Sequence, residues 1–307
     1  MSRFDSINLA ELPPPAVVEE IDWRAIRNAT LDDFLERLRA EGVTDYAPVE
    51  SDPAVKEIEA GAYREMGMRA RVNDAARAVM LATATGADLD NLGAFYGVKR
   101  KLLDEGDPDA TPPVPPTYES DEDYRRRIQL APEAFSTCGP QGAYIYHALA
   151  ADRRVKDAQA YGPEDGVGLT PAQVLVVILS RDGDGSCPAE LVDAVRAYIS
   201  ADERRPLADE VFVQGAEIVP YEITASLTIL PGADPAVVEA AARAALERYA
   251  AERHRVGLSV DVSFVHRALA QPGVERVTLA SPAADVEIGP TQAAHCSAIN
   301  ITVEAAA

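Results

Sequence analysis

Hydrophobic positions in the first hundred residues recur at helical spacing. An amphipathic stretch covers residues 21–38 and follows an opening with three consecutive prolines at 13–15. Asp52 and Pro53 then supply a capping side chain and a first-turn proline, and Gly86 supplies a C-terminal cap. The pattern predicts an extended arm, a first helix, and a second helix over residues 52–85 with a length of roughly 45–50 Å.

One side of this second helix carries small or flexible residues at spacings of four and three. These residues are Ile58, Ala62, Met66, Arg69, Val72, Ala76, Val79 and Thr83. Apolar or small residues also occupy a second side, at Tyr63, Ala70 and Leu81. A helix that is apolar on several sides must be covered on several sides, so it is either buried in its own domain or packed between neighbouring chains. The spacing alone does not distinguish these two arrangements, and we name the stripe as the candidate interface of a helical bundle.

Residues 104–120 interrupt the helical pattern. Between positions 104 and 123 the chain holds eight acidic residues, five prolines and no lysine or arginine. Such a composition cannot bury a core and predicts an extended, self-repelling linker. We expect an N-terminal helical arm and bundle region over residues 1–103, this linker, and a C-terminal domain over residues 121–307.

Strand patterns begin beyond the linker. Ser120 caps one predicted helix that reaches Leu130, and another helix covers residues 141–151. A continuous apolar run predicts a strand buried on both faces, whereas strict alternation predicts a half-exposed strand. These two strands lie at residues 174–179 and 221–229.

Helices are predicted after each of these strands, and the second of them begins after the capping residue Asp234. The remaining predicted elements are helices over 188–200 and 235–251, a strand over 258–262, a short helix over 264–270 and a strand over 274–279. The fold class is α+β, with a long-helix arm followed by small mixed sheets and helices. A weak internal repeat of roughly 50 residues suggests two subdomains, 121–215 and 216–307.

Charge and hydropathy exclude several classes of partner. The formal net charge of −21 would repel phosphate backbones, and no basic stripe offsets it, so we expect no nucleic acid partner. No apolar run approaches the ~20 residues of a membrane-spanning helix, and the opening lacks a secretion signal. The chain has three cysteines, an odd number, and they are widely spaced at Cys138, Cys187 and Cys296. This pattern predicts reduced thiols rather than disulfides. We expect synthesis in the cytoplasm and no membrane partner.

The common catalytic and metal-binding motifs do not occur in the chain. Phosphate-loop, serine-hydrolase and zinc-protease signatures are all missing. A calcium loop begun at Asp182 would put Cys187 where a sharp turn needs glycine, so residues 182–185 are predicted to form a strand-to-helix turn. His295 and Cys296 lack a second ligand pair and are predicted in a surface loop. We predict that the chain has no catalytic, cofactor-binding or metal site and that it is not an enzyme.

The remaining histidines and the arginine clusters have structural interpretations. His147 and His266 fall at helical positions, and His254 lies between two arginines and is expected to be exposed. The arginines at 125–127 and 204–205 are predicted to lie on solvated faces or at caps. They are also candidates for pairing with another chain's acidic surface.

Two long segments resemble the baseplate J-like proteins of contractile-tailed phages. They are DPAVKEIEAGAYREMGMRARVNDAARAVMLATATGADLDNLGAFYGVKR from position 52 and DYRRRIQLAPEAFSTCGPQGAYIYHALAADRRVKDAQAY from position 123. Weaker, collinear likenesses continue through GDGSCPAELVDAVRAYI, ERRPLADEVFV and PGVERVTLASPAADV, so the resemblance covers nearly the whole chain. Cys138, where a smaller residue is more usual, and the acidic linker are local departures.

The resemblance implies a structural wedge subunit of the baseplate of a contractile phage tail or related injection particle, assembled in the bacterial cytoplasm. It implies that two copies of the chain share a helical bundle with a dissimilar wedge subunit, and that wedges are linked into a ring around the central hub. Other inner-baseplate proteins and hub or sheath-initiating proteins would be neighbours. The alternative is a catalytic tail component such as a cell-wall hydrolase, which would need two carboxylates converging in a cleft.

Overall fold

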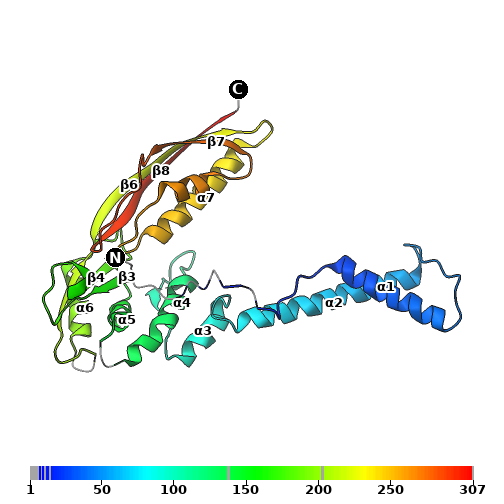
Figure 1. Ribbon diagram of the computed structural model, residues 1–307, viewed down its shortest axis with the longest axis horizontal. Helices are drawn as coiled ribbons and strands as arrows, with labels where there is room; N and C mark the ends of the chain where they lie inside the picture. The colour runs from blue at the N-terminus through cyan, green and yellow to red at the C-terminus, as the bar shows by residue number, and fades with distance from the viewer. Residues whose placement is uncertain are drawn as a thin grey trace. The chain divides into compact units, whose positions relative to one another are not determined.

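The chain forms two compact units in the computed structural model (Figure 1). The structure describes residues 7, 9, 12, 13, 15–136, 139–201 and 204–305, so Cys138 lies outside the described residues. The smaller unit is Ile7–Lys99, and the larger unit holds the described residues from Arg100 onward. The prediction of an α+β fold, with N-terminal helices followed by small mixed sheets, is confirmed. The predicted domain boundaries stay a prediction.

The described part of the smaller unit contains three α-helices, and the first two pack against each other as a helical hairpin. They are α1 (Trp23–Ala40), α2 (Pro53–Ala78) and α3 (Gly86–Phe95). Asp52 caps α2 as predicted, because its carboxylate accepts a hydrogen bond from the backbone N–H of Ala54 at 2.9 Å. The hydroxyl of Tyr46 donates to the same carboxylate at 2.6 Å and fixes its position.

The predicted C-terminal end of α2 is wrong. The helix ends at Ala78, and its 26 residues span about 39 Å rather than the predicted length. The hydroxyl of Thr83 donates to the carbonyl of Arg77 at 2.7 Å, and a side chain that bonds backbone in this way competes with continued helix. Gly86 opens α3 with φ of +52°, a conformation that glycine adopts freely, and so it is not the cap of α2.

The first half of the larger unit contains a three-stranded sheet of order β3-β4-β5. The central strand β4 is antiparallel to β3 and parallel to β5, and helices α5 and α6 pack on the sheet. The predicted burial of β4 on both faces is confirmed along Leu175–Leu179. The elements here are β1 (Leu102–Asp104), β2 (Thr117–Tyr118), α4 (Asp121–Leu130), α5 (Gln141–Ala151), β3 (Val155–Tyr161), β4 (Gln173–Ser180), α6 (Ala189–Ile199) and β5 (Glu210–Gly215), with short 3-10 helices at Ala131–Phe135 and Pro163–Asp165.

A second sheet, of order β7-β6-β8, forms the other half of the larger unit. Its central strand β6 alternates between buried and less buried positions as predicted, and α7 lies along the covered face (Figure 1). Asp234 caps α7 as predicted, accepting from the N–H of Ala236 at 2.9 Å. The elements are β6 (Glu217–Ile229), α7 (Pro235–Arg253), α8 (Val262–Leu269), β7 (Val274–Ser281) and β8 (Gln292–Ala305).

Two predictions in this half are wrong. Residues 258–262 form no named strand, because Val260 makes only a single bridge to Val286 and Val262 already begins α8. His295 and Cys296 lie within strand β8 and not in a surface loop. Strand β8 was missed because its central residues, AAHCSAIN, mix small and polar side chains and show no clean alternation.

Residues 104–120 are not an extended chain, contrary to expectation. Strands β1 and β2 pair antiparallel, and Asp107 bridges Val114 further out, so the segment folds back on itself as a hairpin. Gly106, at φ of +69°, lets the two arms approach closely, because a Cβ there would clash with the carbonyl oxygen of Val114. The self-repulsion expected of the acidic side chains is reduced because Asp104, Glu105, Asp107 and Asp109 are exposed to water, and the buried Glu119 pairs with Arg127.

Candidate functional site

Some residues of the predicted stripe are covered by the rest of the smaller unit, and others are exposed. Ala62 is fully buried, and Ile58, Met66, Arg69 and Ala76 are half-buried. These five positions lie near Val55 and Asn73, the other buried residues of the helix, on the face that the chain covers itself. Val72 is exposed instead, as are Val79 and Thr83, which follow the last residue of the helix. The stripe therefore serves partly to hold the smaller unit together.

The segment before α1 covers the second half of α2 through polar contacts. Asn73 exchanges two hydrogen bonds with the backbone of Glu19, accepting from its N–H at 3.1 Å and donating to its carbonyl at 2.8 Å. Arg69 pairs with the carboxylates of Glu19 at 2.9 Å and Glu65 at 2.7 Å. A buried amide with both of its groups bonded fixes one register between the two segments. Arg69 and Asn73 are thus used within the chain.

A second line of residues on α2 is left uncovered. We call it the exposed seam, and its members recur at spacings of seven, four, three and four. They are Gly61, Met68, Val72 and Ala75 on the helix, and Val79, its C-terminal capping residue. Met68 is 72% exposed, Val72 54% and Val79 71%, so large apolar side chains on this line face away from the rest of the unit. Arg64 and Arg71 are exposed at neighbouring positions of the helix.

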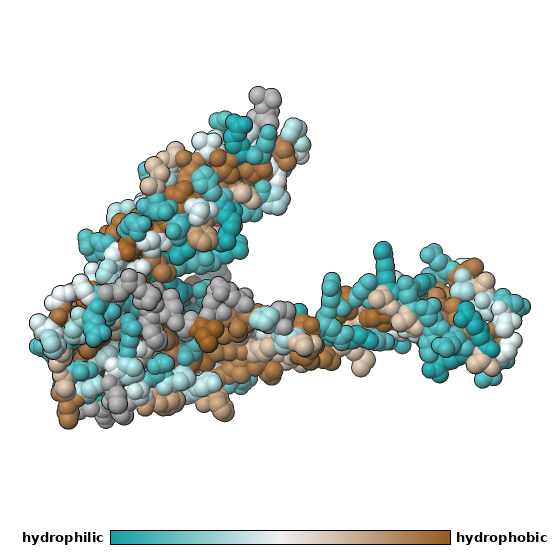
Figure 2. All heavy atoms as spheres, viewed as in Figure 1, coloured by the Kyte–Doolittle hydropathy of each residue, from teal (hydrophilic) through white to brown (hydrophobic). Residues whose placement is uncertain are grey.

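Helix α3 adds an exposed aromatic pair at its C-terminal end. The rings of Phe95 and Tyr96 meet edge to face with centroids 5.3 Å apart, and both are exposed. Figure 2 shows apolar residues gathered over α3 and the adjoining end of α2. The sequence analysis missed this pair, although two adjacent aromatic residues just before a glycine, Gly97, were a usable signal for an exposed helix end.

The described residues of the larger unit contain a buried network of charges. Arg127 forms an ion pair with Glu119, and Arg126 forms one with Asp157, whose side chain is fully buried. Arg181 pairs with Asp123 at 2.6 Å. The prediction that the 125–127 arginines lie on a solvated face is therefore wrong for Arg126 and Arg127. Carboxylates from β3 and from the hairpin draw them inward, since a buried carboxylate needs a cation partner.

Lys101 occupies the centre of this network. Its ammonium group donates hydrogen bonds to the carbonyls of Leu149 and, at 2.8 Å, Asp152, at the end of α5. A cation at the C-terminal end of a helix is favourable, yet burial, together with the nearby charge of Arg127, lowers the pKa of Lys101 to about 8. The lysine is a structural cap with a shifted pKa.

His254 and Cys187 have packing roles in the larger unit. His254 is half-buried rather than exposed, because its Nδ1 lies 2.7 Å from the carbonyl of Ala294, and burial lowers its pKa. Burial raises the pKa of the Cys187 thiol to about 11, which makes it a poor nucleophile. The strand-to-helix turn predicted at 182–185 is confirmed, since the N–H of Ser180 donates to the carbonyl of Gly185 at 2.9 Å between β4 and α6.

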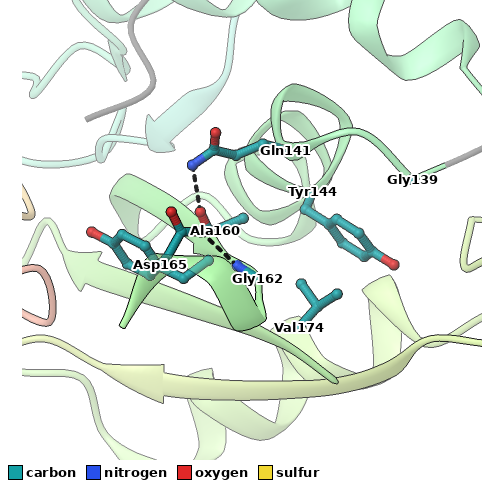
Figure 3. Close-up of a pocket in the computed structure, with 8 residues that line it drawn as sticks. Gly139, Gln141, Tyr144, Ala160, Gly162, Asp165 and Val174 are labelled. Carbon is teal, nitrogen blue, oxygen red and sulfur yellow. Dashed lines mark hydrogen bonds between the residues drawn. The ribbon is translucent and has the colours of Figure 1, made fainter. Parts of the chain in front are cut away.

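A hollow of about 180 Å³ opens beside α5 and β3, and its polar groups are engaged within the chain (Figure 3). The amide of Gln141 donates to the carbonyl of Ala160 at 2.6 Å, and the carboxylate of Asp165 accepts from the N–H of Gly162 at 2.7 Å. The hydroxyl of Tyr144 donates to Asp209 at 2.6 Å. Among the described residues that line it, Asp165 supplies the carboxylate, and this group already caps a turn.

Three domain models of one known family match the chain, in order from its N-terminal to its C-terminal part. Residues 50–107 match the baseplate J-like N-terminal domain, residues 136–215 the central domain and residues 221–302 the C-terminal domain. Baseplate protein J of Escherichia phage P2 is 43% identical over 294 residues, which are 95% of each chain. A chain of the anti-feeding prophage baseplate aligns with a TM-score of 0.37 and 12% identity, over 61% of this chain and 44% of that one. The chain belongs to the baseplate J-like family, a family of structural baseplate proteins rather than enzymes.

Proposed function

We propose that the chain is a wedge subunit in the baseplate of a contractile phage tail or a related contractile injection particle, and that it links wedges into a ring around the central hub. Family membership over nearly the whole chain supports the baseplate location. The observation that carries the wedge role is the exposed seam on α2, which has the spacing of a helix-packing surface and is not covered by the described residues of the smaller unit.

The partners proposed for the seam are helices of a second copy of the chain and of a dissimilar wedge subunit. Gly61 and Ala75 permit close approach of another helix, and Met68 adapts its shape to different neighbours. Val72 and Val79 are the two members of the predicted stripe that we assign to the bundle. Inner-baseplate proteins and hub or sheath-initiating proteins are proposed neighbours of the larger unit.

Co-expression tests the wedge role directly. The chain is produced with the gene products encoded beside it, and each complex is weighed by light scattering after size exclusion. We expect a stable complex with two copies of this chain and one dissimilar subunit. In the producing host, disruption of the gene should leave no complete tails in electron micrographs, and the wild-type gene should restore them. A chain that stays alone in solution, and whose loss leaves tails intact, would rule the proposal out.

A further inference from the structure

The hairpin at residues 102–119 projects from a locked base. Leu102 pairs with Tyr118 and Asp104 with Thr117. Further out, Asp107 and Val114 exchange both backbone hydrogen bonds at 2.9 Å. Three levels of pairing hold the arms together, so the projecting part keeps a defined direction instead of sampling many.

Buried charges anchor the base to the body of the larger unit. The N–H of Lys101 donates to the carboxylate of Glu119 at 2.7 Å, and the N–H of Glu119 donates to the carbonyl of Lys101 at 3.0 Å. The same carboxylate pairs with Arg127 on α4, while the side chain of Lys101 caps α5. The two ends of the segment therefore meet at one fixed place, and the segment adds no reach between its flanks.

The return arm exposes an apolar surface that cannot join a β-sheet. Every residue from 111 to 118 is exposed, with Val114 at 50% and Tyr118 at 53%. Four of these residues are prolines, Pro112, Pro113, Pro115 and Pro116. Proline has no N–H to donate to a neighbouring strand, so this arm cannot extend a regular β-ladder, and its rings and two large side chains are the main surface it offers to another chain.

The opposite arm sets the charge that a partner must carry. Asp104, Glu105, Asp107 and Asp109 are all exposed, and residues 102–120 contain no lysine or arginine. A partner surface that contacts both arms must therefore carry positive charge, because this already acidic protein would repel a negative surface.

We propose that this hairpin is a docking arm that inserts its proline-rich edge into an aromatic-lined groove with a lysine- or arginine-rich rim on another protein of the particle. Flat aromatic side chains are the groups that bind exposed proline rings, and a pre-ordered proline segment loses little conformational entropy on binding. The proposal rests on the proposed function, because it takes the partner from the assembled baseplate.

Photocrosslinking identifies the partner in assembled particles. The variant Val114→p-benzoylphenylalanine is produced in the host in place of the wild-type chain, and purified particles are irradiated. We expect one covalent adduct to another protein of the particle, with the linked peptide next to aromatic and basic residues. The control places the same photoreactive residue at Val237, an exposed valine on α7 that lies outside the hairpin. Particles that contain the Val114 variant and give no adduct to any protein overturn the docking arm.

Competition for incorporation measures the contribution of each arm. A tagged variant is co-expressed with the untagged wild-type chain, and the tagged fraction is compared between lysate and purified particles. We expect Pro112→Ser/Pro113→Ser/Pro115→Ser/Pro116→Ser and Glu105→Lys/Asp109→Lys each to be depleted about tenfold, the factor that corresponds to 1.4 kcal/mol, while Val237→Ser is not. The urea midpoints of all variants are measured first to confirm folding.

The outcomes separate this proposal from the proposed function. Equal incorporation of the hairpin variants overturns the docking arm and leaves the wedge role intact, because the wild-type chain is present in the particles. Absence of the wild-type chain from particles overturns the proposed function instead. A hairpin that serves only to block edge-to-edge aggregation would make the proline variant aggregate in the lysate while its soluble fraction is incorporated normally, and that result also overturns the docking arm.

Discussion

The fully buried carboxylate of Asp157, on β3, accepts a hydrogen bond from the backbone N–H of Val256 at 2.8 Å, although 99 residues separate them in sequence. The other oxygen of the same carboxylate pairs with Arg126 on α4. The hydroxyl of Tyr161 donates to the carbonyl of Pro290 nearby, and a small apolar core that includes Val177 and Ala293 fills the same junction. The two sheets of the larger unit are thus joined by both polar and apolar contacts.

This junction predicts a large loss of stability on changing Asp157→Asn. The amide has nearly the shape of the carboxylate, but it leaves Arg126 without a charge partner and turns one acceptor into a donor. Breaking a buried ion pair by removing one partner typically costs about 3 kcal/mol or more. Urea unfolding should show a loss of that order, and Asp157→Asn/Arg126→Met should recover part of it.

The control for this prediction is Asp193→Asn. Asp193 pairs with Arg196 at 3.0 Å on α6, but both side chains are largely exposed to water. Exposed pairs contribute about 0.5 kcal/mol at most in a helix. If Asp157→Asn costs no more than this control, the buried pair does not stabilise the junction and the two sheets are held together by the apolar core alone.

Lys101 predicts a stability change with pH. Burial lowers its pKa in the folded chain from 10.5 to about 8. Between these two values the unfolded chain keeps a proton that the folded chain has lost, so stability should rise with pH through this window. Below pH 8 both states are protonated, and the folded chain bears the full cost of the buried charge. The rise amounts to about 3 kcal/mol at 1.36 kcal/mol per pKa unit.

Two variants isolate this effect from the other titrating groups. Lys101→Met has no charge, and Lys101→Arg keeps its charge throughout the window, so neither should show the rise that the wild-type chain shows between pH 8 and 10.5. The measurement is the free energy of unfolding in urea at several pH values. Parallel curves for the wild type and both variants would contradict the shifted pKa of Lys101.

Local rules were sufficient to predict much of the fold. Asp52, Ser120 and Asp234 each cap the helix that the sequence assigned to them, and the apolar run of β4 and the alternation of β6 identified the two central strands. Strand β8 could not be found in this way, because it is stabilised by pairing with β6 over thirteen positions and not by its own composition. Its identity as a strand depends on a neighbour some 75 residues away.

The exposed and buried residues of α2 and α4 were harder to predict from the sequence. A helical stripe shows which residues share a face, but Ala62 and Val72 belong to one predicted stripe and differ in burial because α1 and the segment at Glu19 cover only part of it. Arg126 and Arg127 look like surface residues in the sequence, but two carboxylates outside their own helix draw them inward, Asp157 on β3 and Glu119 just before α4. Both errors come from tertiary contacts that spacing along one helix cannot specify.

The division of α2 predicts opposite effects for two substitutions to glutamate. Ala62→Glu places a charge in the fully buried contact and should destabilise the smaller unit by at least 2 kcal/mol, even in the isolated chain. Met68→Glu changes an exposed side chain and should leave the isolated chain stable within about 0.5 kcal/mol, yet block co-purification with the wedge partners. Thermal unfolding and pull-down are measured on the same preparations. Normal assembly with Met68→Glu would remove the exposed seam from the proposed bundle.

Because the ends of the hairpin meet at its base, cutting its tip should not separate the chain. A recognition sequence for a site-specific protease, inserted after the exposed residue Asp109, should be cleaved readily, since exposed tips tolerate insertion and nicking. The two fragments should nevertheless co-elute in size exclusion and separate only in denaturant, because β1 and β2 remain paired and Lys101 and Glu119 remain bonded.

The variant Glu119→Ala tests the base of the hairpin more directly. It removes the carboxylate that holds both the N–H of Lys101 and the guanidinium of Arg127, so the nicked variant should release its N-terminal fragment. The matched variant Glu164→Ala changes an exposed carboxylate elsewhere in the larger unit and should keep its fragments together after nicking. An extended, mobile linker makes the opposite prediction, because the wild-type fragments would then part as soon as the tip is cut. Release from the nicked wild type would show that residues 104–120 are such a linker and not a hairpin on a fixed base.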